Sequence, residues 1–330
     1  MMRSIRRILI AIKDCEARST PALVKGAQLA RALGARVELF HAISIPLYVD
    51  GYAVTGVELP RIENDTRAQV LTHLERMAAK LRQDQIKVTV AAEWDYPGYE
   101  AIVRRAQQTR ADLIVADQHA GRHRAAGLLH LTDWELLRLS PLPVLLVKTP
   151  GTYRRPVILA ALDPEHAYSK PAKLDQRILA ASSSLARALH GIQHAMHAYV
   201  PFPYMADPGT MVSRETVTRL EDAATAAAQK LLDRELRATR IPRARRHIVG
   251  RHPDDAIPET ARKTHAAIVV MGAVSRSGLK RLFIGNTAER VLDLLTCDIL
   301  IVKPAQFTNH VARVRRGARV VAAAPLPTPL

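Results

Sequence analysis

The chain has little cysteine and no long hydrophobic run. Its only cysteines, Cys15 and Cys297, lie near opposite ends of the 330 residues, which argues against a disulfide framework and a zinc site and fits a reducing compartment. The apolar run 8–12 meets Lys13 and Asp14 and is too short for a signal peptide, and no segment is apolar enough to span a bilayer. We therefore expect a cytoplasmic protein with no membrane partner.

Aromatic residues are scarce, and acidic residues are outnumbered by basic ones. Phe, Trp and Tyr make up 4% of the chain, and 48 Lys and Arg against 31 Asp and Glu give a formal charge of +17. Clustered basic side chains attract nucleic-acid phosphates. However, they are dense only at 240–247 and 313–319, and the aromatic platforms on which bases stack are few. The composition therefore disfavours specific nucleic-acid binding.

The sequence repeats itself. Three apolar segments of the first half recur in the second half in the same order: 6–14 as 155–163, 111–117 as 266–272, and 142–148 as 297–303. Pro, Gly and Thr at 148–156 mark a linker. We expect two domains, 1–152 and 153–308. The remaining 309–330 is basic and rich in Pro and Ala, and we expect it to be a disordered tail, because proline cannot continue a helix or a central strand.

Within each half, short apolar runs alternate with amphipathic helical patterns. In the first half, a loop containing Pro46, Gly51 and Pro60 leads to a long helix at about 62–83. All-apolar strands separated by helices are typical of a parallel sheet buried on both faces, because parallel strands need crossover connections. The predicted fold class is α/β, with two tandem doubly wound five-stranded parallel-sheet domains. Ligands of such sheets bind at the carboxyl ends of the strands, where strand order reverses.

One loop at such a strand end is rich in glycine. The stretch GAVSRSGLKRLFIGNT, at 272–287, follows the fourth strand of the second half and leads into a helix starting near Asn286 and Thr287. Free N–H groups at a helix start attract anions, and glycine lets the backbone approach a ligand. The stretch could cradle phosphates, and Gly, Ser and Thr there could equally serve helix capping alone.

These residues resemble the universal stress protein family. Its signature is Gly, two residues, Gly, nine residues, then Gly followed by Ser or Thr, and Gly272 and Gly285 match the first and third glycines, with the nine residues 276–284 before Gly285. The segments 285–304 and 132–148 resemble the matching parts of a tandem member. The resemblance implies this five-stranded fold and dimerisation through the last strands. The two halves are thus expected to form an internal pseudo-dimer, and a homodimer with a second chain stays open.

The resemblance also implies a site for ATP, with or without Mg²⁺, in the second domain. Asp163 ends the first strand and would lie against the nucleoside, and the backbone of Ala198 would meet adenine. Met271 and Gly272 would lie beside the ribose. The phosphates would follow the loop to Gly285 and the helix start.

The second domain departs from the signature at two positions. Ser275 stands at the second glycine, where a Cβ adds strain or steric exclusion of about 1 kcal/mol or more. Asn286 stands at the final Ser or Thr, with Thr287 one residue later, and Asn can still cap the helix. Arg276 and Lys280 either bind phosphate or remain solvated side chains on a basic loop.

The first domain has lost the signature. Asp117, Ala120 and His130 stand at the three glycine positions, with Leu131 where the hydroxyl would be. A carboxylate beside polyphosphate is unfavourable without a metal ion. We predict that this half does not bind ATP in the family manner, and that Asp14, after its first strand, caps the next turn as readily as it contacts a ligand.

Histidines are present without a distinctive metal-binding spacing. Asp117, His119, His123 and His130 could suggest a metal site, but a flexible polar loop fits their spacing better. His41 and His197 occupy equivalent places in the two halves, which suggests a role in the fold.

Two functions from different classes are compatible with the sequence. The first is a universal stress response protein that binds ATP or a related nucleotide in its second domain and acts as a regulator. The second is a scaffold or adaptor without a nucleotide, or a binder of another small ligand. An enzyme with substantial turnover has no nucleophile or base to carry it, so slow ATP hydrolysis is the most that we expect.

Overall fold

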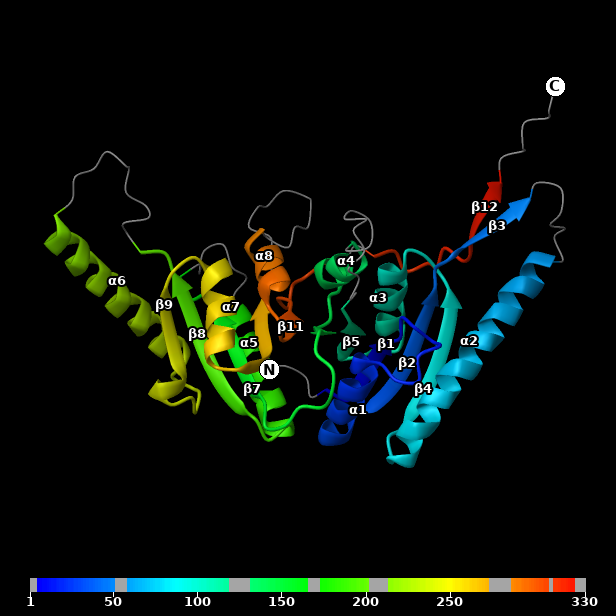
Figure 1. The fold of residues 1–330 in the computed structure, drawn as a ribbon, viewed down its shortest axis with the longest axis horizontal. Helices are drawn as coiled ribbons and strands as arrows, with labels where there is room; N and C mark the ends of the chain where they lie inside the picture. Colours follow the sequence, from blue (N-terminus) through cyan, green and yellow to red (C-terminus); the bar gives the residue numbers. More distant parts are fainter. Residues whose placement is uncertain are drawn as a thin grey trace, which may run out of the picture. The chain divides into compact units, whose positions relative to one another are not determined.

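The computed structural model describes residues 5–50, 58–118, 131–165, 173–201, 213–272, 286–308 and 311–323. The chain divides into two compact units. The N-terminal unit comprises residues 4–151 together with 309–330, and the C-terminal unit comprises residues 152–308 together with 1–3. Strands and helices alternate along each half (Figure 1).

The N-terminal unit contains a five-stranded parallel sheet in the order β4-β2-β1-β5-β6. Its strands are β1 (Arg7–Ala11), β2 (Arg36–Ile43), β4 (Val88–Trp94), β5 (Leu113–Asp117) and β6 (Val144–Val147). Its helices are α1 (Pro21–Leu33), α2 (Glu58–Gln83), α3 (Gly98–Gln108) and α4 (Leu131–Leu139).

The C-terminal unit repeats this arrangement with the order β11-β10-β7-β8-β9, again with parallel neighbours. Its strands are β7 (Val157–Leu162), β8 (Ile192–Tyr199), β9 (Arg246–Gly250), β10 (Ala266–Gly272) and β11 (Asp298–Val302). Its helices are α5 (Leu174–Ala188), α6 (Arg214–Glu235), a short 3₁₀ turn at Arg243–Arg245, α7 (Pro253–Lys263) and α8 (Asn286–Leu294). The predicted fold class, two doubly wound α/β domains in tandem, is confirmed.

The central strands are buried because helices cover both faces of each sheet. Ile8, Leu9 and Ile10 of β1 are at most 1% exposed, and all five residues of β11 are buried. The helix α1 has its ends set by local chemistry: Thr20 Oγ1 accepts the Leu23 N–H, and Gly34 adopts a left-handed φ of 63° at the carboxyl end. Burial of this apolar surface stabilises each unit.

Two segments differ from the sequence-based expectation. Residues 46–50, expected in a loop, form β3 (Pro46–Asp50), and residues 319–323, within the expected disordered tail, form β12 (Arg319–Ala323). The two strands pair in parallel and lie side by side at the upper right of Figure 1. The described part of the tail, 311–323, therefore belongs to the N-terminal unit. Its partner strand lies far away in sequence, so the pairing could not be predicted from local sequence.

The linker between the halves packs against the C-terminal unit. The C-terminal unit starts at residue 152, against the predicted 153. Tyr153 is buried, and its hydroxyl lies 2.6 Å from Oδ2 of Asp298, which ties the linker to β11. Burial, with the neighbouring Asp298 carboxylate, raises the pKa of Tyr153 well above its ordinary value.

Close packing at Gly191 generates a test of the fold. A Cβ on Gly191 would lie 2.3 Å from the carbonyl oxygen of Pro156, which is already held by the Ile192 N–H. We expect Gly191→Ala to lower the free energy of unfolding by about 1–3 kcal/mol, because the backbone must shift. The matched control is Gly98→Ala, whose Cβ would be 3.5 Å from its nearest atom, Ser44 Oγ. Urea unfolding of both variants should separate them, and equal midpoints would contradict the described packing.

Candidate functional site

Two predicted site residues meet at the switch point of the C-terminal unit. The strand β7 lies between β10 and β8, and the chain leaves β7 toward β8 but later crosses back to form β10 on the other side. Asp163 directly follows β7, and Met271 and Gly272 end β10. Doubly wound sheets bind their ligands where strand order reverses in this way. The geometry therefore brings Asp163 and Gly272 to adjacent strand ends.

Ala198 lies one strand away. It belongs to β8, where its Cα partner on β9 is Val249, and the preceding His197 has Leu162 of β7 as its partner. Ala198 is thus close to the end of β8, beside the strand that Asp163 follows. The three neighbouring strands β10, β7 and β8 carry four of the predicted residues at their carboxyl ends.

Gly272 has a packing reason to be glycine. A Cβ at this position would lie 2.7 Å from Cδ2 of Leu174 and 3.3 Å from Cδ1 of Ile178, both on α5. Its φ lies outside the left-handed region, so close approach of the helix, rather than an unusual backbone angle, requires the glycine. Glycine here serves the packing of α5 whether or not a ligand binds.

A residue that the sequence reasoning missed, Asp175 in the first turn of α5, bonds to the backbone of Asp163. Its carboxyl group is buried, and Oδ1 accepts a hydrogen bond of 3.3 Å from the backbone N–H of Asp163. Asp175 therefore helps to position Asp163. An acidic residue in the first turn of a helix that follows a strand was the available signal, because negative charge is favourable there.

His41 and His197 have the same role in the two units. Nδ1 of His41 lies 2.8 Å from the Ile12 carbonyl oxygen, and Nδ1 of His197 lies 3.3 Å from that of Leu162. Each ring thus joins the second strand to the end of the first, which supports the predicted role in the fold. Burial lowers the pKa of His41 below its ordinary value.

The two strand-end aspartates differ. Asp163 is one residue beyond the carbonyl group that its histidine contacts, whereas Asp14 is two residues beyond the corresponding one. Asp14 Oδ1 accepts the N–H groups of Glu16 at 2.9 Å and Ala17 at 3.1 Å, so it caps the next turn. The offset and the capped turn distinguish Asp14 from Asp163.

Asp117 ends β5 of the N-terminal unit, at the position that Gly272 has in the C-terminal unit. Its Oδ1 accepts a 2.7 Å hydrogen bond from the backbone N–H of Ala22, in the first turn of α1. Burial raises the pKa of Asp117 above its ordinary value. A carboxylate of the chain itself therefore lies at the helix start, where it would repel a phosphate.

Several predicted residues lie outside the described residues. These are Ser275, Arg276, Lys280 and Gly285 of the glycine-rich loop, together with His119, Ala120, His123 and His130 of the first domain. Asn286 and Thr287 begin α8, so the helix starts where it was expected, and a capping role for Asn286 stays a prediction. Among the residues that the structure describes, no group of three or more His, Cys, Asp and Glu side chains could hold a metal ion. None of the described helices has the length and apolarity needed to cross a membrane.

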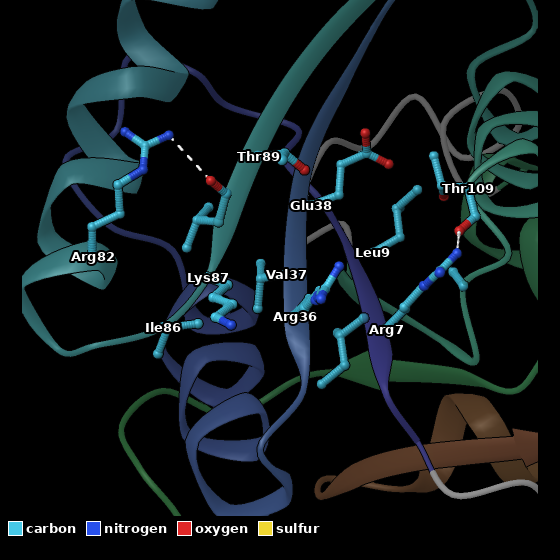
Figure 2. A pocket seen from close by; sticks show the side chains of 13 residues that line it. Arg7, Leu9, Arg36, Val37, Glu38, Arg82, Ile86, Lys87, Thr89 and Thr109 are labelled. Carbon is cyan, nitrogen blue, oxygen red and sulfur yellow. Dashed lines mark hydrogen bonds between the residues drawn. The ribbon is translucent and has the colours of Figure 1, made fainter.

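A cavity of about 620 Å³ lies at the opposite edge of the N-terminal sheet (Figure 2). Four basic residues line it: Arg7 and Arg36, which begin β1 and β2, Lys87, which precedes β4, and Arg82 of α2. Arg7 is engaged through Nη1, which donates to the Thr109 carbonyl oxygen at 2.9 Å. This is the amino-terminal edge, which doubly wound sheets do not use for their ligands. None of the predicted site residues lines this cavity.

Comparison with known proteins identifies relatives that match nearly the whole chain. Residues 4–148 and 157–303 match the family model described as universal stress protein family. Universal stress protein E of Salmonella typhi is 25% identical over 318 residues, covering 92% of this chain and 96% of the relative. The protein of that name from Escherichia coli strain K12 is 26% identical over 314 residues, with the same coverage.

Two solved structures are similar over most of the chain. A putative universal stress protein from Pseudomonas aeruginosa UCBPP-PA14 has a TM-score of 0.68 at 25% identity, covering 92% of this chain and 95% of that one. A protein of unknown function from Pseudomonas aeruginosa PAO1 has a TM-score of 0.67 at 25% identity, covering 92% and 94%. The chain therefore belongs to the universal stress protein family, with two family domains in tandem.

Proposed function

We propose that the chain is a cytoplasmic stress-response regulator that binds ATP or a related nucleotide at the carboxyl edge of the C-terminal unit. The observation that supports this most is the convergence of Asp163 and Gly272 at the switch point, with the loop to α8 following β10. Nucleotide binding would then bias a conformational or partner equilibrium, because a ligand shifts an equilibrium by its differential affinity for the two states.

The residues at this edge can supply each part of a nucleotide site. The Asp163 carboxylate can accept a hydrogen bond from a ribose hydroxyl or an amino group. The backbone N–H groups at the start of α8 can bind phosphate, and Arg276 and Lys280 of the loop carry the matching charge. Asp163 and Asp175 add negative charge nearby, so Mg²⁺ would offset the repulsion from a polyphosphate.

A scaffold without a nucleotide is the second candidate, and one observation favours it. Gly272 is needed for the approach of Leu174, so its presence alone does not indicate a phosphate site. If the site has drifted, the C-terminal unit would serve protein contacts or another small ligand. The experiments below distinguish the two candidates. In either case we propose no catalytic turnover beyond slow ATP hydrolysis.

The nucleotide itself can be tested directly. Purified chain, denatured and analysed by mass spectrometry, should release adenine nucleotide, and ATP with Mg²⁺ should give calorimetric heat with the emptied protein. We expect Asp163→Asn to weaken that binding by about tenfold or more, because hydrogen bonds to a charged group contribute about 1.5–3 kcal/mol. Asp14→Asn is the matched control and should leave the affinity unchanged.

Three results would contradict the proposal in different ways. The absence of released nucleotide, of heat and of a thermal shift with ATP would reject nucleotide binding. Equal affinities of Asp163→Asn and the unmodified chain would place the nucleotide elsewhere. A loss in Asp14→Asn alone would assign it to the N-terminal unit. Substitution of Gly272 is a poor test, because a side chain there collides with Leu174.

Asp117 gives a prediction about pH. Since burial raises its pKa in the folded state, its contribution to stability is fully present below the ordinary value of 3.8 and is lost as the pH rises through the raised value. Asp117→Asn keeps an oxygen acceptor for Ala22 and removes the charge. The unfolding free energy of the variant relative to the unmodified chain should therefore increase from about pH 3.8 toward neutral pH.

Thermal unfolding across this pH range measures the effect. If the difference in unfolding free energy between the variant and the unmodified chain did not change with pH, the raised pKa of Asp117 would be contradicted. Nucleotide binding provides the control, because Asp117→Asn should neither create nor remove it.

A further inference from the structure

The basic cluster at 313–319 has a partner within the chain. The C-terminal segment, residues 311–323, lies against the N-terminal unit, where it contacts β3, the end of β4 and the first turns of α3. We call this surface the dock and define it by Asp95, Tyr96, Glu100 and Arg104 together with β3. Two of the four arginines in this cluster, Arg315 and Arg316, thus pair with acidic side chains.

The centre of the dock is a buried ion pair that the segment completes. Asp95 and Arg104 are 1% and 2% exposed, with 3.0 Å between Arg104 Nε and Asp95 Oδ2. Arg104 Nη1 donates to the Ala312 carbonyl oxygen at 3.0 Å, and the Arg316 N–H donates to Asp95 Oδ1 at 2.9 Å. Buried charged groups need hydrogen-bond partners, and the backbone of residues 312–316 supplies them to Asp95 and Arg104. The ion pair therefore favours binding of this backbone segment.

The rim of the dock selects an arginine. Nη2 of Arg316 lies 3.0 Å from Oε2 of Glu100, and its guanidinium lies 5.7 Å from the centre of the Tyr96 ring. Arg315 Nη1 is 3.6 Å from Glu93 Oε2. Carboxylate and aromatic groups around one guanidinium give geometric selectivity.

Beyond Arg316 the segment binds through its backbone. The parallel ladder of β12 and β3 runs from Arg319 opposite Pro46 to Ala323 opposite Asp50. A two-stranded sheet is marginal by itself, so the ladder depends on the ion pairs that hold residues 312–316. The ladder and the ion pairs together fix the register of the whole segment.

The equivalent surface of the C-terminal unit has different chemistry. The helices α3 and α7 both have 11 residues, so Glu259 of α7 stands where Arg104 stands in α3. Glu259 is paired with Arg251 at 2.7 Å, and an open cavity of about 830 Å³ runs along this stripe of α7. Because Glu259 replaces the arginine, the C-terminal unit lacks at this place the guanidinium group that donates to the Ala312 carbonyl oxygen in the N-terminal unit. The dock is therefore specific to the N-terminal unit.

We propose that the dock is also an interaction surface for a second copy of the chain, which inserts its own C-terminal segment there. Residues up to 308 belong to the C-terminal unit and residues from 309 to the N-terminal unit, so the segment changes units at one point of the chain. The described contacts of the segment with the dock are the same whether it comes from the same chain or another one. Exchange of a terminal element between identical chains is a low-cost route to a dimer.

Within one chain the effective concentration of the segment is about millimolar, which favours the closed monomer. Exchange therefore increases with protein concentration and on mild warming, when segments are released. The interaction is independent of nucleotide binding and concerns the other unit of the chain.

Cysteine trapping between two full-length chains tests the exchange. Leu47 and Val320 are Cα partners in the β3–β12 ladder, at a spacing of about 5 Å that suits a disulfide. One chain carries Leu47→Cys and a differently tagged chain carries Val320→Cys. After mixing at high concentration and oxidation with diamide, we expect a disulfide-linked heterodimer. The native thiols should not compete, because Cys297 is buried and burial raises the pKa of Cys15 to about 12.

The controls distinguish a disulfide formed by an exchanged segment bound in the dock from one formed by random collision of two chains. Val314→Cys, on a residue that is 78% exposed against 45% for Val320, should give several-fold less heterodimer with Leu47→Cys, whereas random collision would give more. Adding Arg316→Glu to the Val320→Cys chain should reduce the yield, because that segment fits the dock less well. The double variant with both cysteines in one chain should form its disulfide internally.

Each outcome decides the proposal. A yield with Val320→Cys no higher than with Val314→Cys, or one unaffected by Arg316→Glu, overturns the exchange. Failure of the double variant to close internally overturns the dock itself. Circular dichroism of each variant before mixing confirms that it is folded, and a variant that is not folded is replaced by the next ladder pair, Pro46 with Arg319.

Discussion

Both units depend on one constraint, the connection of buried parallel strands by helices. Such strands must all run in one direction, so every carboxyl end lies at the same edge of its sheet. In the C-terminal unit this constraint brings Asp163 beside Gly272 although more than a hundred residues separate them in sequence. The same topology in the N-terminal unit brings Asp117 to the first turn of α1. The site is thus a consequence of the sheet, and its chemistry depends on which side chain stands at each strand end.

The sequence predicted most of the fold because its information is local. Apolar runs of four to eight residues and amphipathic periods indicate strands and helices, and the internal repeat indicated two similar domains. The strands β3 and β12 were missed although Tyr48, Val49, Val320 and Val321 are strand-forming residue types, because each apolar run is short and pairs only with the other. Backbone pairing over such a sequence separation leaves no local signal.

For the candidate site, sequence reasoning predicted where residues stand in the fold, and their binding of a ligand stays a prediction. Asp163 lies at its predicted strand end, but Asp175, which bonds to its backbone, was not identified. Gly272 was expected beside the ribose as a glycine that lets a ligand approach, whereas Leu174 and Ile178 already require a glycine there. Packing across a sheet is not visible in spacing. The two halves also differ at equivalent places, with Asp117 for Gly272 and Arg104 for Glu259, so each unit has its own chemistry on a shared framework.

The position of β12 has a consequence for protein synthesis. Residues 319–323 complete the ladder with β3 and follow every strand of the C-terminal unit in sequence, whereas the rest of the N-terminal unit is made first. The C-terminal unit contains all of its strands by residue 302. Since domains fold as they leave the ribosome, the unit that is synthesised first is the one completed last. Until then the acidic dock on nascent chains is open, and polysomes hold many such chains close together.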